Sequence, residues 1–216
     1  MAEVPQRMSQ GFQSISTLSE DSFNRLISAL EEMKPKLFPN QISNELVSKV
    51  TDISFDDLSA IVSTILTINS QRALDNSTPE DLADHVSDWI ADSDVPIKDR
   101  EAFKSRLLRF FKLDTLFVSA KALGILQSNE NVFRGARIVT DVRPVFGSDA
   151  KAPPTAAVLV HTLDLSYQKD GDIKHMYIAM DSMDIGVLRE ALDRADKKAE
   201  GLKPLIKGAE LLDPSE

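Results

Sequence analysis

The stretch AAVLVHTLDLSYQKDGDIKHMYIAM, residues 156–180, decides the fold of the C-terminal half. Ala157, Leu159, His161, Leu163, Leu165 and Tyr167 recur at every second position, which is the period of a β-strand. Gly171 stands in the turn at 169–172, where positive φ is expected, and residues 173–180 continue as the next strand. The stretch therefore predicts an antiparallel hairpin.

The flanking segments extend this hairpin on both sides. Residues 136–146 alternate apolar and charged side chains and predict a preceding strand, with Pro144 at an edge or bulge. Residues 183–202 have helical spacing and predict a long terminal helix. We expect a β-β-β-α domain over 131–216, in which the helix covers one face of the sheet.

The N-terminal half has the period of helices. We expect a loose tail over 1–16, broken by Pro5 and Gly11, and then a six-helix domain over 17–130. Caps at Ser19, Ser54 and Thr78 mark three helix starts. The helix after Ser54 is apolar around most of its circumference and should be the central one. The fold class is thus α+β: a six-helix bundle, a three-stranded antiparallel sheet and a long C-terminal helix.

Charge and composition restrict the function. The 216-residue chain carries a net charge of −9, so nucleic-acid binding is disfavoured. There are no cysteines, which fits a reducing compartment, and no apolar run is long enough to span a membrane. We expect a cytoplasmic protein.

The order of elements resembles that of the COMM-domain proteins, in which a helical domain precedes three antiparallel strands and one helix. The corresponding stretches are 136–146, 155–167, 172–181 and 183–202. The sequence departs from the family at the start of the first strand, where many members carry a tryptophan; Trp89 is the only one here. The resemblance implies dimerisation through interlocked C-terminal domains and a scaffold or adaptor role without catalysis.

No arrangement of residues predicts catalysis or a bound group. The chain has no phosphate-binding loop and no catalytic or metal motif, so we expect no enzyme activity, no cofactor and no metal. His85 should pack beside Trp89 on the apolar side of its helix. Pairing about the turn at 170–171 places His161 opposite residue 180 and His175 opposite residue 166, too far offset to share a metal.

Both faces of the predicted sheet are apolar in part, which predicts a homodimer through this half. The predicted interface residues are Val142, Val158, Val160, Met176, Ile178 and Met180.

One alternative is a regulatory protein whose basic helix at 98–112 contacts nucleic acid or an acidic partner. Its predicted residues are Arg100, Lys104, Arg106 and Arg109, unless this helix simply balances its acidic neighbour at 80–94. A third hypothesis is an enzyme with a carboxylate site between the domains.

Overall fold

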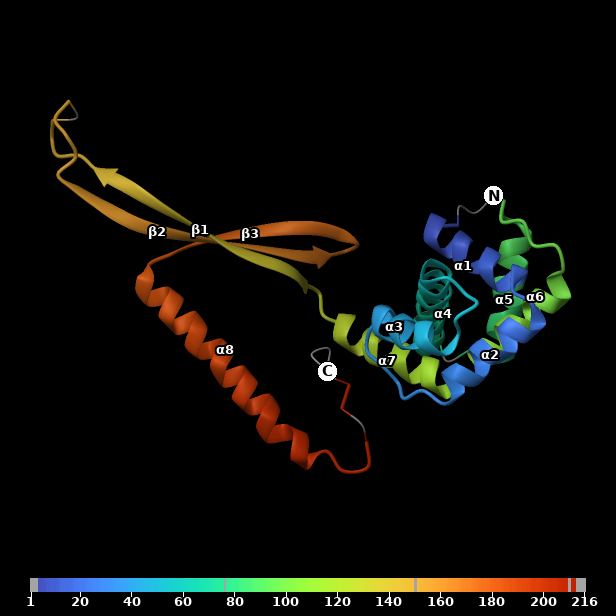
Figure 1. Ribbon diagram of the computed structural model, residues 1–216. Coiled ribbons are helices and arrows are strands. Elements are labelled where there is room, and N and C mark those ends of the chain that lie inside the picture. Colours follow the sequence, from blue (N-terminus) through green and yellow to red (C-terminus); the bar gives the residue numbers. More distant parts are fainter. Residues whose placement is uncertain (1–3, 76, 150, 210, 213–216) are drawn as a thin grey trace. The chain divides into compact units, whose positions relative to one another are not determined.

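The computed structural model describes residues 4–75, 77–149, 151–209 and 211–212 (Figure 1). The chain separates into a helical unit, which extends to Gln127, and a C-terminal unit, Ser128–Leu211. Each has its own pattern of secondary structure, and the two are described in turn.

Seven helices, not six, precede the sheet among the described residues. They are α1 (Gln6–Thr17), α2 (Glu20–Glu31), α3 (Pro39–Lys49), α4 (Phe55–Asp75), α5 (Pro79–Ala91), α6 (Arg100–Phe111) and α7 (Asp114–Gln127). The expected caps are present: Ser19 accepts a hydrogen bond from the backbone of Ser22, and Thr78 accepts one from Asp81. Helix α4 is central, as predicted, and α1, α3 and α7 all pack against it.

The additional helix is α1, and it corrects the expectation of a loose tail. Pro5 lies just before the first helical residue, where a proline is tolerated. Phe12 and Ile15 are fully buried in the core of the helical unit. Gly11 lies so close to α4 that a Cβ atom there would be 2.2 Å from Thr64 Oγ1. Gly11 therefore permits close packing of α1 and does not break the helix.

The C-terminal unit contains the predicted three-stranded sheet and long helix. Strands β1 (Val132–Val145), β2 (Ala156–Lys169) and β3 (Asp172–Met180) are antiparallel in the order β1-β2-β3. Asp170 and Gly171 both have positive φ, 53° and 88°, in the tight turn between β2 and β3. Helix α8 (Ser182–Leu202) follows and ends in a short 3₁₀ turn, Lys203–Leu205.

The strands differ in length, which leaves part of the sheet with two strands. Residues 156–169 of β2 pair with β1 almost throughout, whereas β3 pairs only with residues 161–169. Residues 141–145 and 156–160 therefore form a ribbon that extends past the end of β3 (Figure 1). An isolated two-stranded ribbon has little stability in water.

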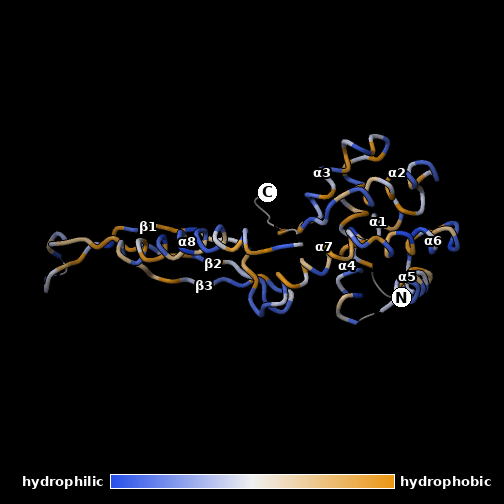
Figure 2. The backbone as a smooth tube through the Cα atoms, turned by 90° about the horizontal axis from the view of Figure 1, so that it is seen from below, coloured by the Kyte–Doolittle hydropathy of each residue, from blue (hydrophilic) through white to orange (hydrophobic). Residues whose placement is uncertain are grey.

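Helix α8 does not cover the sheet as expected. None of its described residues is buried, and it makes few contacts with β2 and β3. Figure 2 shows hydrophobic positions recurring along both the strands and α8. The unit thus has the elements of a two-layer fold, but the two layers are not closed on each other.

Candidate assembly surface

Strand register divides the sheet into two unlike faces. Residues directly opposite one another on paired strands share a face, so Leu163 lies beside Ile138 of β1 and Ile178 of β3. We call this side the apolar face. Its members with large hydrophobic side chains are Ile138, Val142, Leu159, Leu163, Leu165, Met176, Ile178 and Met180.

The predicted interface residues divide between the two faces. Val142, Met176, Ile178 and Met180 lie on the apolar face. Val158 and Val160 lie on the opposite face, where Val158 is directly opposite Arg143 and Val160 is directly opposite Asp141. The six residues therefore do not form one continuous patch. On the second face, charged residues of β1 stand opposite both valines in the ribbon, and β2 itself is polar further along, at Thr162, Asp164 and Ser166. The expectation that both faces are apolar in part therefore holds for single strands of the second face and not for a continuous surface.

That polar region contains a cluster of one residue from each strand. Asp164 of β2 is only 5% exposed, accepts a 2.9 Å hydrogen bond from Arg137 Nε of β1, and lies 2.8 Å from His175 Nδ1 of β3. The bond to His175 and then that to Arg137 hold the pKa of Asp164 below its ordinary value. The sequence predicts His175 opposite residue 166, two positions from Asp164, but it does not fix the register of β1, so the contact with Arg137 could not be predicted.

The cluster fixes how the three strands align. A register shift of one residue would move Asp164 to the apolar face and separate it from both partners. An unpaired carboxylate on an apolar surface is costly. The cluster and the β2–β3 turn therefore specify the same register, which presents the apolar face as one surface.

The apolar face and α8 are largely uncovered. In the described part of Ser128–Leu211, the buried hydrophobic side chains are Leu163 and Met180. Large side chains that are exposed on these elements include Val142, Leu159, Met176, Ile178, Met183, Val187, Leu192 and Leu202. Exposed apolar surface of this kind makes the apolar face and α8 a candidate interaction surface.

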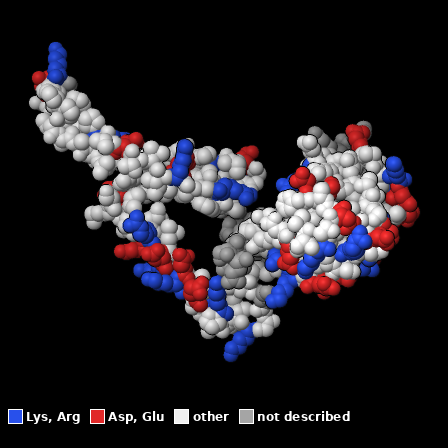
Figure 3. Space-filling view, in the orientation of Figure 1, with Lys and Arg blue, Asp and Glu red and all other residues white. Residues whose placement is uncertain are grey.

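Charged side chains on α6 face acidic side chains of neighbouring helices. Lys104 forms an ion pair with Asp84, and Lys112 Nζ lies 2.9 Å from Glu80 Oε1, both on α5. Arg106 and Arg109 both contact Glu20 of α2. Red and blue side chains are accordingly interspersed over the helical unit (Figure 3). The pairs with Asp84 and Glu80 match the interpretation in which the basic helix balances its acidic neighbour at 80–94, whereas Glu20 lies outside that neighbour.

Arg106 and Arg100 also contact residues of the helical unit itself. Arg106 is mostly buried and donates a 2.8 Å hydrogen bond to the carbonyl oxygen of Ile15. Its guanidinium carbon lies 5.0 Å from the centre of the Phe23 ring. Arg100 lines a small depression with Ser93 and Phe103. Arg106 is therefore part of the packing between α1, α2 and α6.

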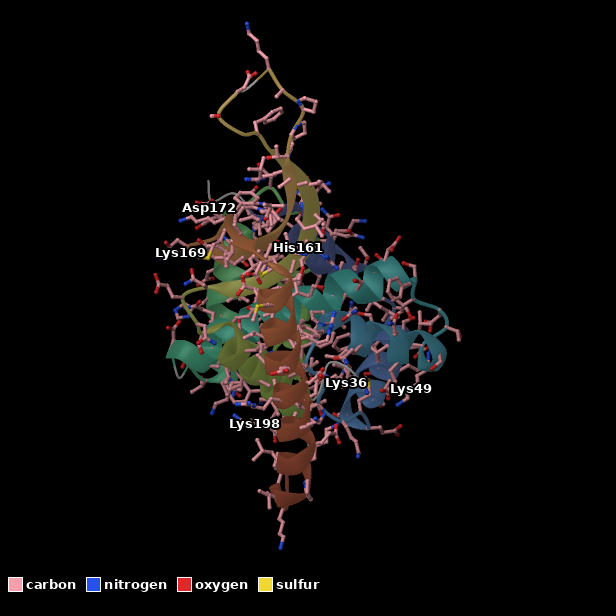
Figure 4. All side chains as sticks on the ribbon, turned by 90° about the vertical axis from the view of Figure 1, so that its left-hand side faces the viewer. Lys36, Lys49, His161, Lys169, Asp172 and Lys198 are labelled. Carbon is pink, nitrogen blue, oxygen red and sulfur yellow. The ribbon has the colours of Figure 1, made fainter. Side chains whose placement is uncertain are left out.

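The three histidines lie at separate positions. His85 is exposed, which corrects the expectation that it packs beside Trp89. His161 is opposite Met180 and His175 is opposite Ser166, the offset predicted from the turn. Figure 4 shows His161 apart from the turn residues Lys169 and Asp172. In the described residues, no three side chains of metal-binding type come together.

No protein-family model matches the chain, and no curated protein matches it. Within the described residues, none of the helices has the length and apolar character needed to cross a membrane.

Proposed function

We propose that this protein is a non-enzymatic interaction protein of the scaffold or adaptor type, which assembles as a homodimer through its C-terminal unit. The observation that supports this proposal is the uncovered apolar face, together with an α8 in which no described residue is buried. The helical region followed by β-β-β-α also agrees with the resemblance to COMM-domain proteins.

The C-terminal unit buries little of the apolar surface that a stable sheet requires. Fully burying a large aliphatic side chain contributes about 1.5–3 kcal/mol, and a sheet needs a covered face to be stable. Only Leu163 and Met180 supply such burial among the described hydrophobic residues of this unit. A partner that covers the apolar face would supply the missing stabilisation.

A second copy of the chain is the partner that would cover both the apolar face and the apolar side of α8. Each chain has an apolar face that needs a cover and an amphipathic helix whose apolar side needs a surface. Two chains related by a two-fold axis can each place α8 on the other's sheet, because a two-fold interface uses the same surfaces twice. Residues 131–216 carry a net charge of only −2, so they oppose self-association weakly.

The test places a charge on each face of β3 in turn. Met176 is 49% exposed on the apolar face, and Ile173 is 58% exposed on the opposite face. In a lone chain both aspartate variants should be tolerated similarly, because both positions are solvated. In the proposed dimer, Met176→Asp buries a charge and should abolish the dimer, whereas Ile173→Asp should retain it.

Sedimentation velocity on the full-length variants distinguishes the outcomes. The proposal is contradicted if both variants sediment as the wild type does, or if the Ile173→Asp variant dissociates and the Met176→Asp variant does not. Circular dichroism of each variant reports whether the helical unit remains folded, so a loss of assembly can be separated from general misfolding.

A further inference from the structure

The ribbon exposes a strand edge that differs from every other edge of the sheet. Residues 156–160 of β2 pair with β1 on one side, and no described strand pairs with them on the other. We call this segment the free edge of β2. Its backbone N–H and C=O groups on that side are available to another strand.

The other edges carry residues that discourage strand pairing. The outer edge of β1 contains Arg134, Arg137, Arg143 and Pro144, together with an irregularity between Phe133 and Gly135. The outer edge of β3 contains Asp172, Lys174 and His175. Charges, prolines and bulges are the features with which proteins protect strand edges from association. The free edge of β2, AAVLV, has none of them.

We infer that the free edge of β2 pairs with the same segment of a second copy, in antiparallel orientation about Val158. The pairing rests on the proposed dimer and specifies where its backbones meet. Val158 would lie opposite itself, Ala157 opposite Leu159, and Ala156 opposite Val160. All the paired side chains are apolar, so the segment is complementary to itself. A two-fold interface requires this self-complementarity.

Val158 is the centre that uses the whole free edge without including a proline or a residue already paired with β3. A shift of one residue towards the N-terminus would place Pro154, which cannot donate a backbone hydrogen bond, opposite Val160. A shift towards the C-terminus brings in His161 and Thr162, whose outer sides are already paired with Met180 and Ala179 of β3. Centring on Val158 uses all five residues of the free edge.

The absence of cysteine from the chain makes this inference directly testable. Directly opposed residues on antiparallel strands have Cα atoms about 4.5–5.5 Å apart, within the range of about 4.4–6.8 Å that a disulfide spans. Under mild oxidation, Val158→Cys in the full-length protein should yield a covalent dimer as the main product on a non-reducing gel.

Val139→Cys is the matched control. Val139 is 46% exposed and Val158 is 50% exposed, and the two lie on the same face of the sheet. Val139 is paired with Thr162, four residues from Val158. In the proposed pairing, residue 139 and its copy are therefore about 14 Å apart across three strand spacings and displaced by a further eight residues along the strands. This variant should therefore remain uncrosslinked under the same conditions.

The outcomes separate this inference from the proposed function. If light scattering gives a dimer but neither Val158→Cys nor the double variant Ala157→Cys/Leu159→Cys crosslinks, edge pairing is wrong and the dimer stands. If the protein is a monomer by mass, both are wrong. Equal crosslinking at 158 and 139 would indicate random collision and would also overturn the edge pairing.

A charge exchange gives a second measurement that does not depend on oxidation. Like charges directly opposite are destabilising, so Val158→Lys and Val158→Asp should each weaken the dimer by about fivefold. An equimolar mixture of the two variants should restore the affinity, because lysine then faces aspartate. Undiminished dimerisation of both single variants would contradict the pairing of residue 158 with itself.

Discussion

The helical unit and the C-terminal unit of one chain use apolar residues in opposite ways. In the helical unit, Phe12, Phe23, Phe103, Phe110 and Phe111 are fully buried, and the hydrophobic core is continuous among its helices. In the C-terminal unit, side chains of comparable size stand on the sheet and on α8 in contact with solvent. This contrast in burial is the basis of our proposal that the second unit completes its core with another molecule, whereas the first unit has a core of its own.

The largest expected effect comes from a substitution that removes an aromatic ring from the core of the helical unit. Phe110 is fully buried and lies edge-on to Phe23, with 5.4 Å between the ring centres. Phe110→Ala should lower the free energy of unfolding by about 3–5 kcal/mol, at every protein concentration. Denaturant unfolding followed by helical circular dichroism measures it, with Phe55→Ala at an exposed position as the control. Equal losses for the two variants would contradict the assigned core.

A smaller effect tests whether α1 belongs to the helical unit. Gly11→Ala places a Cβ atom 2.7 Å from the carbonyl oxygen of Ala60 and closer still to Thr64, so α1 and α4 must separate. We expect a loss of about 1–3 kcal/mol from overpacking. Thermal melting measures it, and Gly124→Ala is the control because a Cβ atom there meets nothing. An unchanged melting temperature for Gly11→Ala would mean that residues 6–17 are not packed on α4.

The C-terminal unit should respond to pH through Asp164. Because bonds from His175 and Arg137 lower its pKa, the folded form holds the proton less tightly than the unfolded form does. The resulting stabilisation is complete above the unfolded pKa of about 3.9, and is lost as the pH falls through the lower folded value. Asp164→Asn should therefore melt at a lower temperature than wild type at pH 7, and this difference should shrink in acid.

The control for Asp164 is another aspartate on the same face. Asp141→Asn, on β1, should leave the pH dependence of melting close to that of wild type. A difference between wild type and Asp164→Asn that stays constant down to pH 3 would show that the charge of Asp164 contributes nothing through its partners.

The smallest expected effect is on the surface of the helical unit. Lys104 and Asp84 form an ion pair at an exposed position, and solvent screens such pairs strongly. Lys104→Gln should leave both the melting temperature and the solution mass unchanged within error. A dissociated Lys104→Gln variant would mean that α6 contributes to the assembly surface, and that the contrast between the two units is wrong.

The sequence predicted the elements whose signals are local. The turn at Asp170–Gly171 fixed the pairing of β2 with β3, and it placed His161 and His175 correctly without any coordinates. Caps at Ser19 and Thr78 located two helix starts. In each case the residues that determine the turn or the helix start lie within a few positions of it.

The features that the sequence did not predict have a different origin. Each of them depends on residues that are distant in the chain. The sequence predicts that Gly11 breaks a helix, but the role of Gly11 depends on Thr64 of α4, 53 positions away. The contact of Asp164 with Arg137 depends on the register of β1, across a long loop. Helix α8 was expected on its own sheet because its spacing shows an apolar side, and spacing cannot specify which surface that side contacts.

The solution mass of the full-length wild-type protein, measured by light scattering over a range of concentrations, tests the central claim most directly. The account predicts a particle of twice the chain mass of 23.9 kDa, with a melting temperature for the C-terminal unit that rises with concentration. A particle of 23.9 kDa at every concentration, with both units melting cooperatively, would contradict the claim that the C-terminal unit completes its core with a second copy.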